Sequence, residues 1–117
     1  MPALPGRHGR VSGIDVACAA DGGAWDCSVR VDDGHGITTH EVRVAAADLA
    51  PVAARAASSP ADVDAVERLV TETFGFLLER EPKEAILARF DLAVVRRYFP
   101  EYDREIRRRL DHGAGVS

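Results

Sequence analysis

Two runs of alternating side chains, separated by a glycine turn, constrain the fold of this chain more than any other feature. Within residues 14–18 and 24–32, apolar side chains recur at every second position, as in strands with one buried face. Gly22 and Gly23 lie between the runs and supply the positive φ angles that a tight β-hairpin requires. The sequence therefore predicts a hairpin with one apolar face.

The pairing of the two strands has two solutions. If the two glycines form the loop, Cys18 lies opposite Cys27 across the ladder. If Asp21 and the first glycine form it, Cys18 lies opposite Trp25. Both solutions keep the same side chains on the apolar face, so the faces are predicted while the register stays open.

A third strand and a long helix complete the predicted core. A turn at residues 32–36 leads into a run over 37–45, in which Val42 and Val44 share one face. Residues 60–81 carry apolar side chains at three- and four-residue spacing, which is typical of a helix with one buried face. We therefore expect an antiparallel three-stranded meander covered by this helix.

Local signals mark where the helical part begins and breaks. Ser59 is a good N-cap before Pro60. Gly75 costs about 1 kcal/mol against alanine inside the helix, which indicates a close approach of backbone there. After Pro82, three short helices are expected over 82–90, 92–99 and 100–110. Too few turns are available to decide whether Leu87 and Val95 face the core or a partner.

The 117 residues suffice for one domain. We expect a flexible arm over residues 1–10, a single α+β domain over 11–111 and a disordered tail over 112–117. The predicted domain includes an alanine-rich connector over 46–60, in which Asp48 could cap a short helical turn.

Charge and cysteine content limit the expected binding partners and the expected cellular compartment. The net charge of −4 argues against general phosphate binding, although residues 82–117 hold 8 basic and 6 acidic side chains. Two cysteines without a Cys-x-x-Cys motif or a secretion signal predict a reducing, cytoplasmic location and no disulfide scaffold. No apolar run approaches the roughly 20 residues of a membrane span, so no membrane role is expected.

Residues 74–102 form an unusual block, FGFLLEREPKEAILARFDLAVVRRYFPEY. It resembles a family of short, uncharacterised bacterial proteins that carry a similar FLLEREPKE…FDL…RYFPEY segment after a strand-rich start. The resemblance covers a quarter of the chain closely and most of it in outline; the main departure is the alanine-rich segment between Ala45 and Ala57. It implies a bacterial source and a stand-alone small protein, and it carries over no activity, cofactor or site residue.

Cys18, Cys27, His35 and His40 are the first chemical candidates. Two thiols and an imidazole on one strand face could hold zinc or form a redox pair. The metal-ligand spacing is missing, however, and small cysteines commonly fill gaps in a core. We therefore favour the packing interpretation and expect no metal.

Catalytic signatures are weak throughout. No serine lies in a Gly-x-Ser-x-Gly elbow, and no glycine-rich loop connects a strand to a helix. His8 and His112 fall in the predicted arm and tail, which leaves only His35 and His40 as general bases. We therefore expect a protein that is not an enzyme and uses no cofactor.

The C-terminal region carries the two binding hypotheses. Arg97, Tyr98 and Tyr102 form an arginine–tyrosine surface of the kind enriched at interface hot spots, which favours protein binding or self-association. A free edge of the small sheet could also pair with a partner strand.

The alternative is a nucleic-acid-binding regulator. It would use a basic face of the last helix made by Arg104, Arg107, Arg108 and Arg109. Acidic residues three or four positions before these arginines indicate a solvated, ion-paired face instead, so protein binding is the favoured function.

Overall fold

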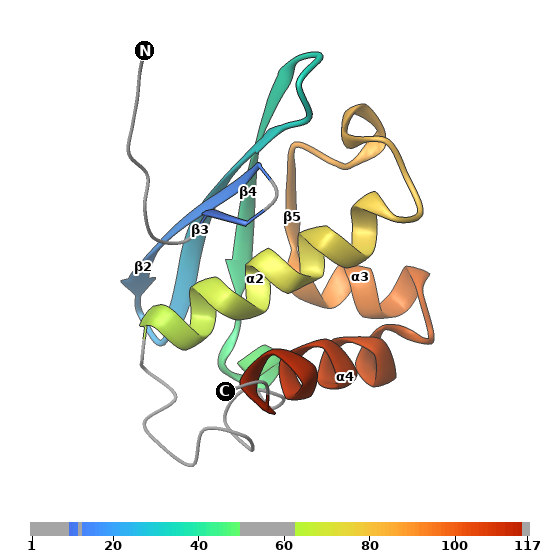
Figure 1. The fold of residues 1–117 in the computed structure, drawn as a ribbon. Helices are drawn as coiled ribbons and strands as arrows, with labels where there is room; N and C mark the ends of the chain where they lie inside the picture. The colour runs from blue at the N-terminus through green and yellow to red at the C-terminus, as the bar shows by residue number, and fades with distance from the viewer. Residues whose placement is uncertain (1–9, 12, 50–62, 116–117) are drawn as a thin grey trace.

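A mixed five-stranded sheet with helices gathered on one face forms the fold (Figure 1). The computed structural model describes residues 10–11, 13–49 and 63–115. The strands follow each other across the sheet in chain order, as β1 (Arg10–Val11), β2 (Ile14–Asp21), β3 (Ala24–Asp32), β4 (Ile37–Val44) and β5 (Arg89–Asp91). Neighbours from β1 to β4 are antiparallel, whereas β5 runs parallel to β4. The predicted α+β class is confirmed.

The β2–β3 hairpin has the register in which the two glycines form the loop. Cys18 lies opposite Cys27, and Val16 lies opposite Val29. Gly22 has a φ angle of +57° and Gly23 one of +85°, and a type I′ turn requires positive values at both positions. The turn glycines therefore decide between the two registers that the alternating pattern leaves open.

The turn between β3 and β4 is held by its own carboxylates. Asp32 accepts a hydrogen bond from the backbone N–H of Gly34, and Asp33 accepts one from that of His35, each at 2.9 Å. These bonds replace the backbone pairing that a tight connection gives up. β4 then returns antiparallel to β3, so β2, β3 and β4 form an antiparallel meander within the larger sheet.

The main helix, α2 (Val63–Leu78), covers the apolar face of the sheet as predicted (Figure 1). Ser59, the expected N-cap, lies outside the described residues. The expected close approach of backbone at Gly75 is wrong: among the described residues, the only atom from outside α2 within 4 Å of a β-carbon built there is Nη1 of the Arg109 side chain, at 3.4 Å.

The chain after α2 departs from the prediction of three short helices. Residues expected to form the first of them make only a 3₁₀ turn, η2 (Lys83–Ala85), and then strand β5. Two α-helices follow, α3 (Leu92–Tyr98) and α4 (Tyr102–Gly115). The helix predicted over 82–90 is therefore wrong, and so is the count of three sheet strands.

Strand β5 has only three residues, which is too short for alternating side chains to predict a strand from the sequence. Phe90 is buried, while Arg89 and Asp91 are exposed. Across the parallel ladder Arg89 lies beside Glu41, and Asp91 lies beside Arg43. Each charge of β5 thus has an opposite charge next to it on β4, and these neighbours come from a distant part of the sequence.

Two sequence-based boundaries also differ. Arg10, expected in the flexible arm, begins β1, and α4 continues to Gly115 although a tail is expected from residue 112. Asp48 lies in a 3₁₀ turn, η1 (Ala46–Leu49), and its carboxylate accepts the backbone N–H of Ala45 at 2.9 Å. Asp48 therefore caps the expected short turn from inside it, by reaching back to the residue before the turn.

Candidate functional site

An apolar groove lies where the end of α2, the segment after η2, and α3 meet. It encloses about 420 Å³, within the usual range of ligand sites. Leu77, Phe90 and Val95 are buried and form its floor. The remaining lining residues are Glu81, Ala85, Ile86, Leu87, Val94, Tyr98 and Phe99. One continuous stretch of chain folds back on itself to build this groove.

Two large side chains of the groove remain open to solvent. Leu87 is 56% exposed and Tyr98 is 72% exposed. Exposed large side chains that gather around one hollow, unlike those scattered singly over a surface, are typical of a binding surface. Arg97, the neighbour of Tyr98, is exposed and has no ion pair with another described residue. The structure thus places Tyr98, one of the predicted contact residues, at the groove.

The wall that carries Leu87 is held from behind by a buried histidine. Nδ1 of His40 lies 2.8 Å from the carbonyl oxygen of Leu87, and Nε2 lies 2.9 Å from Oγ1 of Thr38. A carbonyl only accepts, so Nδ1 carries the proton in the first bond. The N–H of Glu41 also donates to the carbonyl of Ala88, at 2.7 Å. These bonds anchor the groove wall to β4, and both ring nitrogens of His40 are occupied.

Tyr102, the third predicted contact residue, lies in the core. It is 1% exposed, and its hydroxyl oxygen lies 2.7 Å from Oγ1 of Thr73 across the contact between α4 and α2. Burial raises the pKa of Tyr102 to about 12 against the opposing effect of the Thr73 hydrogen bond. This corrects the expectation that Tyr102 belongs to the arginine–tyrosine surface, because the apolar stripe of α4 turns its side chain inward.

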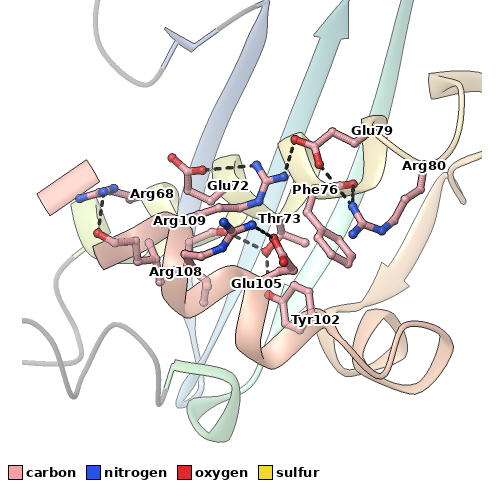
Figure 2. A network of polar contacts seen from close by, with 12 residues as sticks. Arg68, Glu72, Thr73, Phe76, Glu79, Arg80, Tyr102, Glu105, Arg108 and Arg109 are labelled. Atoms are coloured by element: carbon pink, nitrogen blue, oxygen red, sulfur yellow. Dashed lines mark hydrogen bonds and ion pairs between the residues drawn. The ribbon is translucent and has the colours of Figure 1, made fainter. Parts of the chain in front are cut away.

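The arginines considered for nucleic-acid binding divide into two pairs. In the first pair, Nη2 of Arg108 lies 2.7 Å from Glu105, while Arg109 contacts Glu79 closely and Glu72 at 4.0 Å (Figure 2). A phosphate that bound to Arg108 or Arg109 would have to compete with these intramolecular ion pairs.

Arg104 and Arg107 form the second pair. Both are exposed, and neither has an ion pair with another described residue. They line a surface hollow together with Pro100, Glu101 and Asp103. The two carboxylates weaken the attraction of this hollow for an anion. Two of the four arginines are therefore held in ion pairs within the described part of the chain, and the other two lie beside carboxylates.

Two arginines, Arg80 in the turn after α2 and Arg109 in α4, instead lie beside the ring of Phe76 between the two helices (Figure 2). The guanidinium carbon of Arg80 lies 3.7 Å from the centroid of the Phe76 ring, and that of Arg109 lies 5.9 Å from it. Arg80 also donates to the Phe76 carbonyl at 3.0 Å and to Glu101 at 3.3 Å. Part of the C-terminal basic excess thus stabilises helix packing.

The two cysteines form a disulfide across β2 and β3, with an S–S distance of 2.06 Å. Cys27 is fully buried and Cys18 is half-buried. The prediction of unpaired cysteines is therefore wrong, although the glycine-loop register already places them opposite each other. Disulfides persist mainly in oxidising compartments, which argues against the predicted cytoplasmic location.

The histidines do not join the cysteines in a metal site. His35 is exposed in the β3–β4 turn, and His40 is held by its own two hydrogen bonds. Among the described residues, no group of three or more histidine, cysteine, aspartate or glutamate side chains could hold a metal ion.

Lys83 is a buried cation with no signal in the sequence. Its side chain is 3% exposed, and Nζ lies 2.9 Å from Asp33 and also contacts Glu84. Hydrogen bonds to Glu84 and then Asp33 raise the pKa of Lys83. The Lys83 hydrogen bond, followed by the His35 N–H, lowers the pKa of Asp33 to about 2. The pair ties η2 to the β3–β4 turn over 50 residues of sequence.

The sheet edges offer less free backbone than a three-stranded sheet would. β5 pairs with β4 at residues 41–43, and Glu67 of α2 accepts the backbone N–H of Cys18 in β2 at 3.1 Å. Strand addition at these positions would have to displace existing bonds. The groove is therefore the stronger candidate for a binding site.

Comparisons with known proteins do not identify the chain. No family model matches it, and neither the curated proteins nor the solved structures compared with it contain a match. No helix in the described parts of the chain is long and apolar enough to cross a bilayer.

Proposed function

We propose that this chain is a small, non-catalytic bacterial protein that acts by binding another protein at the groove. The observation that carries the proposal is the pair of exposed side chains, Leu87 and Tyr98, around a buried apolar floor. The exposed Arg97 beside Tyr98 adds a second residue type that is enriched at interface hot spots. Every lining residue falls within 74–102, the block that resembles short bacterial proteins.

The expected gain from covering these side chains is measurable. Complete burial of a large apolar side chain contributes about 1.5 to 3 kcal/mol, so covering the exposed parts of Leu87 and Tyr98 contributes about 1 to 2 kcal/mol each. Removing both should weaken binding by roughly 30- to 700-fold. The free protein should lose little stability, because neither side chain is buried in it.

A comparative capture experiment tests the proposal. Tagged wild-type protein, the Leu87→Asp/Tyr98→Ala variant and the Ile37→Asp variant are exposed to lysate of the natural host, with and without nuclease, and bound proteins are quantified by mass spectrometry. Ile37 is 49% exposed and does not line the groove, so its variant controls for the loss of any exposed apolar side chain. Circular dichroism and urea unfolding confirm that each variant is folded.

A nuclease-resistant protein captured by wild type and by Ile37→Asp, but lost with the groove variant, is the expected result. Equal capture by all three proteins would contradict the proposal.

The alternative function is nucleic-acid binding through Arg104 and Arg107, which are exposed and form no ion pair with another described residue. It predicts capture that disappears with nuclease, affinity that falls steeply with salt, and loss of binding in Arg104→Glu/Arg107→Glu. Groove binding predicts that this charge-reversed variant still captures its protein partner.

A further inference from the structure

One carboxylate in the groove has no partner among the described residues. Glu81 is the only charged residue among the described residues that line the groove, and it is half-buried. Its side chain makes no hydrogen bond or ion pair with any described residue. Nearby glutamates are paired, since Glu79 contacts Arg109 and Glu84 contacts Lys83. The groove therefore combines an apolar floor with a single uncompensated negative charge.

This combination selects among possible occupants. A purely apolar segment lying over the groove would remove water from the Glu81 carboxylate without replacing its hydrogen bonds, which is unfavourable. An acidic segment would add repulsion between like charges. A lysine or arginine side chain would restore the hydrogen bonds and add a charge-assisted interaction.

The exposed rim favours a peptide over a small molecule. A compound that fits within about 420 Å³ would fill the hollow but leave much of Leu87 and Tyr98 in water. A peptide lying across the groove would place apolar side chains on the floor and cover both rim residues. It would also carry a cation at a defined position relative to those apolar side chains.

We propose that the groove binds a peptide segment of a partner protein that presents large apolar side chains and a lysine or arginine, and that Glu81 determines this preference by pairing with the basic residue. This inference rests on the proposed function, because it specifies the partner of the same site. It assigns Glu81 a role in specificity, whereas Leu87 and Tyr98 contribute most of the binding free energy.

Selection from a phage library of random linear peptides tests the inference. Peptides are selected on purified wild-type protein and depleted against the Leu87→Asp variant, so that only groove-dependent peptides remain. Their affinities are then measured by fluorescence polarisation for wild type, Glu81→Gln, Glu81→Lys and Glu41→Gln. Glu41 is an exposed carboxylate on the sheet and outside the groove, so Glu41→Gln is the matched control.

The expected peptides contain apolar residues with a nearby lysine or arginine. Glu81→Gln should weaken their binding roughly 10-fold or more, and Glu41→Gln should leave it unchanged. Glu81→Lys should prefer versions in which the basic residue is replaced by glutamate. Circular dichroism of every variant establishes that the fold is intact.

Other outcomes separate the inference from the function on which it rests. Groove-dependent peptides without a basic preference, and unaffected by Glu81→Gln, would overturn the role of Glu81 and leave the proposed function standing. The absence of any peptide that distinguishes wild type from Leu87→Asp would overturn both. A wild-type dimer abolished by Leu87→Asp in sedimentation, or a small molecule retained in native mass spectra, would replace the peptide with another occupant.

Discussion

The buried hydroxyl pair between α2 and α4 supports a prediction about what holds the C-terminal helix in place. Oγ1 of Thr73 donates to the carbonyl of Leu69 at 2.8 Å, which uses its only proton. The hydroxyl of Tyr102, 2.7 Å away, must then donate to Thr73. Thr73 is therefore the acceptor and Tyr102 the donor.

This assignment makes the two single substitutions unequal. Tyr102→Phe removes one hydrogen bond and leaves Thr73 bonded to Leu69, so it should cost about 1 kcal/mol of unfolding free energy. Thr73→Val leaves the tyrosine hydroxyl buried without an acceptor, so it should cost about 1 to 3 kcal/mol. The double variant replaces both partners with apolar groups, and its cost should fall below the sum of the single costs by about 1 kcal/mol.

Urea denaturation followed by circular dichroism measures this cycle. Thr71 provides the control, because it is also buried and donates to a carbonyl four residues earlier, that of Glu67, at 2.8 Å. Thr71→Val combined with Tyr102→Phe should therefore be additive. If Thr73→Val and Tyr102→Phe also add to within about 0.3 kcal/mol, the proposed donor–acceptor pair is refuted.

Three further predictions concern separate parts of the fold. Gly75→Ala should raise the free energy of unfolding by up to about 1 kcal/mol, because the nearest atom, Nη1 of Arg109 at 3.4 Å, ends a flexible side chain; destabilisation in urea would contradict this. Reduction of the Cys18–Cys27 disulfide, which joins residues 9 positions apart, should lower the free energy of unfolding by about 2 to 3 kcal/mol. Urea unfolding with and without dithiothreitol measures the difference, and equal stabilities would exclude a stabilising disulfide. The pKa of Asp33 is lowered from 3.8 to about 2, so its ion pair stabilises the fold above about pH 4 and ceases to do so as the pH falls toward 2. Between about pH 4 and pH 2, urea unfolding should show that the free energy of unfolding falls more in wild type than in Asp33→Asn. An equal fall with pH in the two proteins would refute the role of the ion pair.

The sequence predicted one residue of the candidate site, Tyr98. Tyr98 is exposed at the end of α3, and the arginine–tyrosine composition of residues 97–102 directs attention to this region. The same composition could not separate Tyr98 from Tyr102. They are four residues apart, but an intervening break turns one to solvent and the other into the core.

The groove itself required the tertiary structure. Val95 forms part of its floor and Leu87 part of its rim, a distinction that helices of one or two turns leave undecided. The loop of Leu87 takes its place through the bond from His40, which is 47 residues earlier in the chain. Glu81 and Glu84 look alike in the sequence, and only the fold pairs Glu84 with Lys83 while Glu81 has no partner among the described residues.

The sequence by itself determined the hairpin, its apolar face, the meander and the long covering helix, because side-chain period and turn glycines act between near neighbours. The register that places Cys18 opposite Cys27, and with it the disulfide, was left open by the alternating pattern and was decided by the structure. The tertiary structure alone decided strand β5, the buried Lys83 and the groove. Each of these depends on contacts between segments far apart in the chain, and a three-residue strand or a single charge has no periodicity from which such a partner can be inferred.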